Sequence, residues 1–276
     1  MSVRCVVLDF DGTFTDAEAE AEPFVAAFRA ALADLLGRPI DDDWARWQAT
    51  IEASPGTYGW EFGGRIVAPA TADPYVLSTT IGQAITREAG ILRDPATRSA
   101  ILEALYQLAY LKTRTVFRPE AREVLDTLLD RGLPTFVITN SRTDTVSQKI
   151  DLLGPKHRER LVVLGDAKKF AIGEPKDGWG DVPEERAIEG LSRPVLLHRG
   201  RYFDAIQHVL RTASCKVDEL IVCGDIFELD LALPIALGAN VHLVRGPRTP
   251  AYELAEMGRL GARATAGALR DLLGRL

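Results

Sequence analysis

Hydrophobic positions in the second half of this 276-residue chain follow two alternating spacings. Short β-branched apolar runs predict buried strands, and the segments between them carry apolar residues at the spacing of an amphipathic helix. Strands that alternate with helices form βαβ units, so we expect an α/β fold, a Rossmann-like parallel sheet with helices on both faces. The predicted strands are 3–8, 135–138, 161–164, 220–223 and 241–244, and the predicted helices are 119–131, 144–153, 202–210 and 230–237.

The first half changes pattern after its opening strand. Between residues 16 and 115 no run has the quality of the strands above, and several segments show helical spacing with faces rich in Ala and Leu. We therefore predict an all-helical domain, residues 16–115, inserted into an α/β core domain formed by residues 1–15 and 116–276. Residues 54–74, rich in Gly, Pro and aromatic side chains, predict an ordered loop, and the tail 249–276 predicts terminal helices. The helical segments of the insertion are 21–36, 43–53, 74–89 and 97–111.

Composition narrows the class of protein. Hydrophobic residues make up 46% and charged residues 26%, as in ordinary soluble domains, and the net charge of −6 argues against nucleic acid as a partner. No stretch approaches the roughly 18 apolar residues of a membrane-spanning helix, and the opening residues do not resemble a secretory segment. Cys5, Cys215 and Cys223 lack the spacing of a metal site and predict reduced thiols. We expect a cytoplasmic protein without a membrane partner; the pattern predicts no oligomeric state.

Polar residues follow three of the predicted strands at the point where each strand ends. The carboxyl ends of parallel strands lie along one edge of a sheet, so these side chains are expected to converge on one crevice. Crowded carboxylates repel one another unless a cation joins them, and Mg²⁺ prefers oxygen ligands of this kind. The residues are Asp9 and Asp11 after the first strand, Thr139 and Asn140 after the second, and Asp225 and Asp230 after a later one.

This constellation predicts phosphoryl chemistry. Asp9 would attack phosphorus as a carboxylate nucleophile, and Asp11 would protonate the leaving oxygen and then activate water. The Thr139 hydroxyl and nearby backbone N–H groups would hold a phosphoryl oxygen. Mg²⁺ held by Asp9, Asp225 and the backbone carbonyl of Asp11 would offset the repulsion between nucleophile and substrate.

The same motifs resemble those of the haloacid dehalogenase superfamily. The resemblance rests on Asp-Phe-Asp-Gly-Thr at 9–13, an apolar strand ending in Thr-Asn at 139–140, and Gly224-Asp225 followed by Asp230, and it spans residues 3 to about 244. It implies a Mg²⁺-dependent phosphatase that works through an aspartyl-phosphate. The helical insertion lies where that family has a cap of type C1. Gly12, Thr13 and Asn140 are the motif residues predicted to bind substrate.

The family's third motif, a lysine that pairs with the nucleophile, has no clean counterpart. Lys168 directly follows a predicted strand and is the favoured candidate, with Arg199 and Lys169 next. A hairpin between 169–172 and 195–198 would bring Lys168 and Arg199 to the same crevice. Lys176 is expected to be a solvated loop residue.

Substrate recognition is expected from the cap. The candidates are Tyr58, Trp60, Arg65 and Tyr75, with Arg65 able to hold a second anionic group, although aromatic residues in a small helical domain more often form its core. The favoured function is hydrolysis of a small phosphorylated metabolite. Phosphonate hydrolysis, phosphomutase chemistry and a non-catalytic binding protein of the same fold stay as alternatives. By the resemblance to the family, in which phosphoryl-transfer branches have an aspartate at the place of Asp11 and phosphonate cleavage recruits a cap lysine, Asp11 favours phosphoryl transfer over dehalogenation and the scarcity of lysine before Lys112 counts against phosphonate cleavage.

Overall fold

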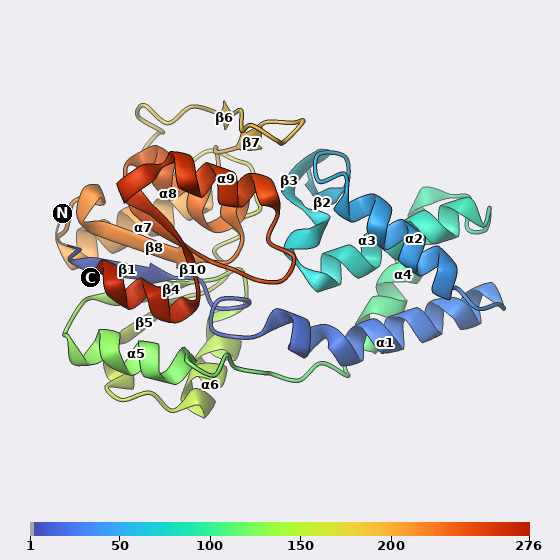
Figure 1. Ribbon diagram of the computed structural model, residues 1–276, viewed down its shortest axis with the longest axis horizontal. Coiled ribbons are helices and arrows are strands. Elements are labelled where there is room, and N and C mark those ends of the chain that lie inside the picture. The colour runs from blue at the N-terminus through green and yellow to red at the C-terminus, as the bar shows by residue number, and fades with distance from the viewer. Residues whose placement is uncertain (1–2) are drawn as a thin grey trace. The chain divides into compact units, whose positions relative to one another are not determined.

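The computed structural model describes residues 3–276, which form two compact units. The sheet unit consists of the residues up to Asp16, Glu61–Ala68 and Phe117–Leu276. The helical unit consists of Ala17–Trp60 and Pro69–Val116. Figure 1 shows the sheet strands in the first unit and helices α1 to α4 in the second. Within residues 3–276, none of the helices has the length and apolar character needed to cross a membrane.

A six-stranded parallel sheet forms the centre of the sheet unit and confirms the predicted fold class. All five predicted strands are present, and a sixth lies in the tail, where helices alone were predicted. The two strands at the centre of the sheet, residues 5–8 and 220–224, are fully buried, as expected for a parallel sheet that is covered on both faces. The strands are β1 Cys5–Leu8, β4 Thr135–Ile138, β5 Leu161–Leu164, β8 Leu220–Gly224, β9 Asn240–Val244 and β10 Ala264–Gly267.

Helices cover both faces of this sheet (Figure 1). Side chains alternate along β1, so Val6 and Leu8 join the core beneath α5 and α6, while Cys5 and Val7 join the core beneath α7, α8 and α9. Each aliphatic side chain buried in this way stabilises the fold by about 1.5–3 kcal/mol. The helices are α5 Ala121–Asp130, α6 Thr143–Leu153, α7 Gly200–Ala213, α8 Ala232–Leu237 and α9 Ala251–Arg259, with a 3-10 segment, η6, at Leu269–Arg275.

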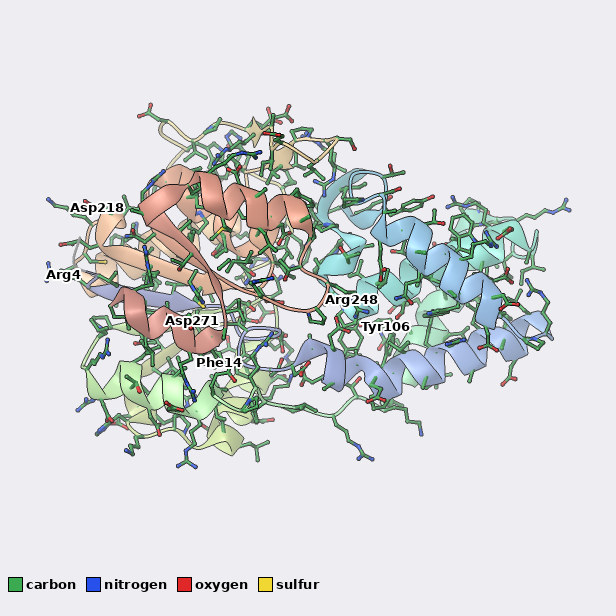
Figure 2. All side chains as sticks on the ribbon, in the orientation of Figure 1. Arg4, Phe14, Tyr106, Asp218, Arg248 and Asp271 are labelled. Carbon is green, nitrogen blue, oxygen red and sulfur yellow. The ribbon has the colours of Figure 1, made fainter. Side chains whose placement is uncertain are left out.

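The strand order β10-β9-β8-β1-β4-β5 creates a reversal point in the sheet. After β1 the chain adds β4 and then β5 on one side of β1. After β8, which pairs with the other side of β1, it adds β9 and then β10 in the opposite direction. Ligands of open α/β sheets bind outside the carboxyl ends of the strands at such a point, here between β1 and β8. Figure 2 shows Arg4 and Asp218 at the amino ends of these two strands and Phe14 beyond the carboxyl end of β1.

Four helices form the helical unit around an aromatic core. Pro74 and Pro95 begin two of them, and each follows an aspartate, Asp73 or Asp94, whose carboxylate accepts hydrogen bonds from the first turn. Tyr75, a predicted substrate contact, lies in that core among other aromatic rings. The helices are α1 Ala17–Leu36, α2 Asp41–Glu52, α3 Pro74–Glu88 and α4 Pro95–Tyr110.

The segment predicted as an ordered loop contains a β-hairpin instead. Strands β2 Gly59–Phe62 and β3 Arg65–Pro69 pair as a two-stranded sheet. Gly63 and Gly64 connect them with φ of +58° and +75°, which glycine adopts without steric cost and which a two-residue hairpin turn requires.

Most of this hairpin, residues 61–68, belongs to the sheet unit. The guanidinium of Arg199 donates to the carbonyl of Val67 over 2.7 Å, and the Phe62 ring lies 5.6 Å from that of Phe170. A segment of the inserted sequence is thus fixed on the sheet unit by a buried cation and an aromatic contact.

The hairpin predicted between 169–172 and 195–198 is wrong. The antiparallel pair is β6 Glu185–Arg186 with β7 Val195–Leu196, and residue 173 instead forms a single parallel bridge to Arg199. The partner of β7 therefore comes from the connection between the two predicted segments and not from residues 169–172. All three cysteines are free, as predicted.

Candidate active site

Two aspartates lie side by side at the reversal point of the sheet. Asp9 directly follows β1 and Asp225 directly follows β8, and Leu8, the last residue of β1, is the register partner of Cys223, two residues before Asp225. Carboxylate oxygens of Asp9, Asp225 and Asp230 all lie within 4.8 Å of one another. One ion can bridge ligands over such a distance.

Two glycines make this close approach possible. A Cβ atom on Gly12 would lie 2.1 Å from Oδ2 of Asp225, and one on Gly224 would lie 2.4 Å from the Cβ of Asp230. Gly12 also has a φ of +82°, which side chains with a Cβ rarely adopt. The two glycines leave the space that the Asp225 and Asp230 side chains occupy.

Asp230 lies in a π-helical turn, Phe227–Leu231, immediately before α8. Its Oδ2 accepts a hydrogen bond from the backbone N–H of Ile226 over 2.9 Å, and its backbone carbonyl accepts one from the Tyr202 hydroxyl over 2.6 Å. Turns of this type are frequent at functional sites. Here the turn aims a buried carboxylate back at the end of β8.

Lys169 joins the nucleophile candidate to Asp230. Its ammonium donates to Asp9 Oδ1 and to Asp230 Oδ1, each over 2.5 Å, and the residue is 1% exposed. Its backbone N–H donates to Oδ1 of Asn140 over 2.6 Å, so Asn140 positions the lysine. Lys168 was the favoured candidate for this contact, but its side chain is exposed and its φ is +46°. Lys169, and not Lys168, is therefore the lysine whose side chain contacts Asp9.

Charge in this cluster is unbalanced. Burial raises the pKa of Asp9 to about 7, with Lys169 opposing the shift, and burial and the charge of Asp9 raise the pKa of Asp225 well above its usual range. Burial acts to lower the pKa of Lys169, but the charges of Asp230 and Asp9 outweigh it and raise that pKa. When all three carboxylates are ionised, they and the one ammonium carry two net negative charges, which match a divalent cation with oxygen ligands such as Mg²⁺.

Asp11 lies at the accessible side of the cluster, with its side chain 39% exposed. Its carboxylate accepts a hydrogen bond from Ser141 Oγ over 2.6 Å and one from the Lys149 ammonium over 3.2 Å. Lys149 also lies 5.7 Å from the centre of the Phe10 ring. Asp11 is thus held by two elements, the end of β4 and helix α6, in a position that solvent and a substrate can reach.

Two threonines line the same strand ends. The Thr13 hydroxyl lies 3.3 Å from both Asp9 Oδ2 and Asp225 Oδ1, and Thr139 is buried, with its oxygen accepting the N–H of Ser141 over 3.1 Å. Arg118 donates twice to the carbonyl of Gly12, over 3.1 and 2.7 Å. These contacts fix the loop that carries Asp9 to Thr13.

The two arginines predicted to bind substrate have other partners. Arg199 is fully buried and donates to three backbone carbonyls, and burial lowers its pKa to about 10. Arg65 is 43% exposed and pairs with Glu184 and Glu185. Neither guanidinium contacts the aspartate cluster among the described residues.

Ser141, Lys149 and Arg118 are site residues that were not predicted from the sequence. Ser141 follows Thr139 and Asn140 directly, so its position at a strand end was a usable signal. Lys149 lies well inside α6, and only the packing of α6 beside β4 brings it to Asp11.

The haloacid dehalogenase-like hydrolase family matches residues 3–178. The chain belongs to this family. Solved structures with the same fold include a predicted phosphoglycolate phosphatase from Haemophilus somnus, at 13% identity with a TM-score of 0.56, covering 99% of this chain and 98% of that one. A family hydrolase from Deinococcus radiodurans with bound phosphate and sodium matches at 17% identity and a TM-score of 0.54, covering 98% and 93%.

A third similar structure is the putative family hydrolase YfnB from Bacillus subtilis bound to magnesium, at 14% identity with a TM-score of 0.54, covering 99% and 98%. A search of curated proteins found no match. Family membership makes the chain a hydrolase of the haloacid dehalogenase type, and the similar structures extend that fold over both of its units.

Proposed function

We propose that this hydrolase is a Mg²⁺-dependent phosphatase that cleaves a small phosphorylated metabolite through an aspartyl-phosphate intermediate. The observation that carries the proposal is the cluster in which Asp9, Asp225 and Asp230 approach within 4.8 Å and share one ammonium, that of Lys169. Phosphate ester cleavage through an aspartyl-phosphate needs a carboxylate nucleophile beside a cation site, and the residues of this cluster suit both roles.

Asp9 and Asp225, with the carbonyl of Asp11, are the residues proposed to hold Mg²⁺. When bound, the ion would neutralise the charge that accumulates on the phosphoryl oxygens and the nucleophile. Asp230, which is tied to Lys169 and to the Ile226 N–H, is assigned to holding the lysine in position.

Asp9 is the proposed nucleophile. One of its oxygens forms a bond to phosphorus as the bond from phosphorus to the leaving oxygen breaks, and the leaving oxygen takes a proton from Asp11. Asp11 then removes a proton from the water that attacks the aspartyl-phosphate, which releases phosphate and restores Asp9. Asp11 lies on the accessible side of the cluster, where a leaving group has room.

Lys169 takes the role that the sequence assigned first to Lys168. Its two hydrogen bonds of 2.5 Å fix the orientation of Asp9 and offset charge between the anionic nucleophile and the anionic substrate. Thr13, Thr139 and the backbone N–H groups around Gly12 and Asn140 are the proposed contacts for phosphoryl oxygens.

Phosphatase activity is also the function named for relatives of this fold: the Haemophilus somnus structure is titled a predicted phosphoglycolate phosphatase, and the Deinococcus radiodurans structure holds phosphate. The net charge of −6 and the free cysteines favour a cytoplasmic enzyme acting on a small soluble substrate. The intact acidic cluster disfavours a non-catalytic binding protein.

The proposal is tested by phosphate release from p-nitrophenyl phosphate with and without Mg²⁺. Asp9→Asn removes the charged nucleophile but keeps its size, so activity should fall by about 10³-fold or more. Asp166→Asn is the matched control because Asp166 is exposed with a φ of +53°, which asparagine tolerates, and it should keep full activity. Turnover that survives in Asp9→Asn, or that needs no divalent ion in the unmodified chain, would contradict the mechanism.

A further inference from the structure

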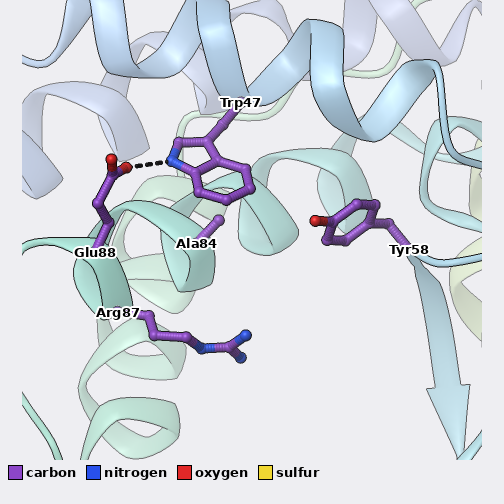
Figure 3. Close-up of a pocket in the computed structure, with 5 residues that line it drawn as sticks. All are labelled: Trp47, Tyr58, Ala84, Arg87 and Glu88. Carbon is purple, nitrogen blue, oxygen red and sulfur yellow. Dashed lines mark hydrogen bonds between the residues drawn. The ribbon is translucent and has the colours of Figure 1, made fainter.

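The helical unit contains a cavity of about 180 Å³ that the proposed chemistry does not use. It is lined by one residue of α2, by three residues of α3 and by Tyr58, which precedes β2. None of these residues belongs to the aspartate cluster. The lining residues are Trp47, Tyr58, Ala84, Arg87 and Glu88 (Figure 3).

Two aromatic rings and a methyl group form most of the wall. Figure 3 shows the rings of Trp47 and Tyr58 beside each other, with the Ala84 methyl group next to the Trp47 indole. Apolar protein cavities of about 150 Å³ accommodate a benzene ring. Aromatic rings also interact favourably with one another in offset or edge-to-face arrangements. Size and lining therefore suit a single planar ring.

The charged groups at the cavity are not equivalent. Glu88 accepts hydrogen bonds from Arg46 over 2.6 Å and from the Trp47 indole over 2.7 Å, and these bonds lower its pKa. Its charge is thus compensated. The Arg87 guanidinium, in contrast, has no hydrogen bond or ion pair to any residue within 3–276.

One uncompensated cation at an aromatic cavity selects for an anionic ring. Arginine binds carboxylates through two parallel N–H···O bonds, which orient the ligand as well as attract it. We propose that this cavity is a binding site for a small aromatic carboxylate, with the ring between Trp47 and Tyr58 and the carboxylate on Arg87. The inference concerns a second site and does not depend on the proposed phosphatase activity.

Isothermal titration with benzoate tests this site directly. For so small a ligand we expect a dissociation constant of about 1 mM. Benzyl alcohol, which has the ring without the charge, and acetate, which has the charge without the ring, should each bind at least about tenfold more weakly. Equal binding of either probe, or no binding of benzoate up to ten times that concentration, would overturn the proposal.

Variants of the lining residues separate the site from non-specific binding. Arg87→Gln should weaken benzoate binding by about tenfold or more, whereas Arg114→Gln, an exposed arginine of the same unit, should leave it unchanged. Ala84→Leu should fill the cavity and abolish binding while the melting temperature stays within a few degrees. Benzoate binding that survives both Arg87→Gln and Ala84→Leu would overturn the assignment.

Discussion

Lys168 and Lys169 are neighbours in sequence with opposite environments. The left-handed φ of Lys168, +46°, turns the chain so that the first side chain faces solvent and the second enters the cluster between Asp9 and Asp230. A sequence pattern contains no information on this dihedral angle, which explains why Lys168 ranked ahead of Lys169, the lysine that contacts Asp9. Asp9 and Asp225, in contrast, follow from the rule that parallel strands end at one edge.

Replacing the two lysines one at a time tests this difference. Lys169→Met leaves two buried carboxylates without their shared cation, so the free energy of unfolding should fall by about 3 kcal/mol and kcat by about 10²-fold or more. Lys168→Met alters an exposed side chain and should change the free energy of unfolding by less than about 0.5 kcal/mol, with unchanged kcat. Urea unfolding and steady-state kinetics give both quantities. Equal effects of the two changes would contradict the assignment of Lys169.

At the scale of elements, strongly apolar runs predicted strands correctly, whereas a strand with a weakly apolar sequence was not predicted. Strands β1, β4, β5, β8 and β9 are mainly hydrophobic and were predicted, although β9 also contains Asn240 and His242. Strand β10, Ala264–Gly267, has little apolar character and is stabilised by its pairing with β9, so a local pattern could not reveal it. The hairpin β2–β3 was missed although Gly63-Gly64, between two aromatic and aliphatic runs, is a recognisable hairpin signal.

The turn after β1 is the element on which the site depends most. Gly12→Ala would force a Cβ to within 2.1 Å of the Asp225 carboxylate at a φ of +82°, whereas Gly37→Ala has a φ of +65° with nothing within 4 Å. Both changes carry the cost of about 1–2 kcal/mol for a left-handed residue. Only Gly12→Ala should also weaken Mg²⁺ binding, by about tenfold or more, because it displaces a ligand. Thermal unfolding with and without Mg²⁺ measures both effects, and a Mg²⁺ stabilisation retained in full by Gly12→Ala would refute the argument.

For the whole molecule, the sequence predicted a parallel α/β sheet with a helical insertion, and the structure has a sheet unit and a helical unit. The insertion is less separate than its periodicity suggests, since residues 61–68 group with the sheet unit through Arg199 and Phe170. Arg199 was predicted to meet substrate because of its place at a helix start. Its burial and its three carbonyl partners depend on tertiary packing, which no local pattern encodes.

The most direct test of the acidic metal site is calorimetric titration of Mg²⁺ into the metal-free protein at pH 6 and pH 8. The pKa of about 7 at Asp9 means that protons compete with the ion at the lower pH, so one ion should bind more tightly at pH 8 and release protons on binding at pH 6. Asp225→Asn should abolish this binding and Asp166→Asn should preserve it. Absence of saturable Mg²⁺ binding, or binding equal in Asp225→Asn and the unmodified chain, would contradict the claim that the ends of β1 and β8 form one divalent-cation site.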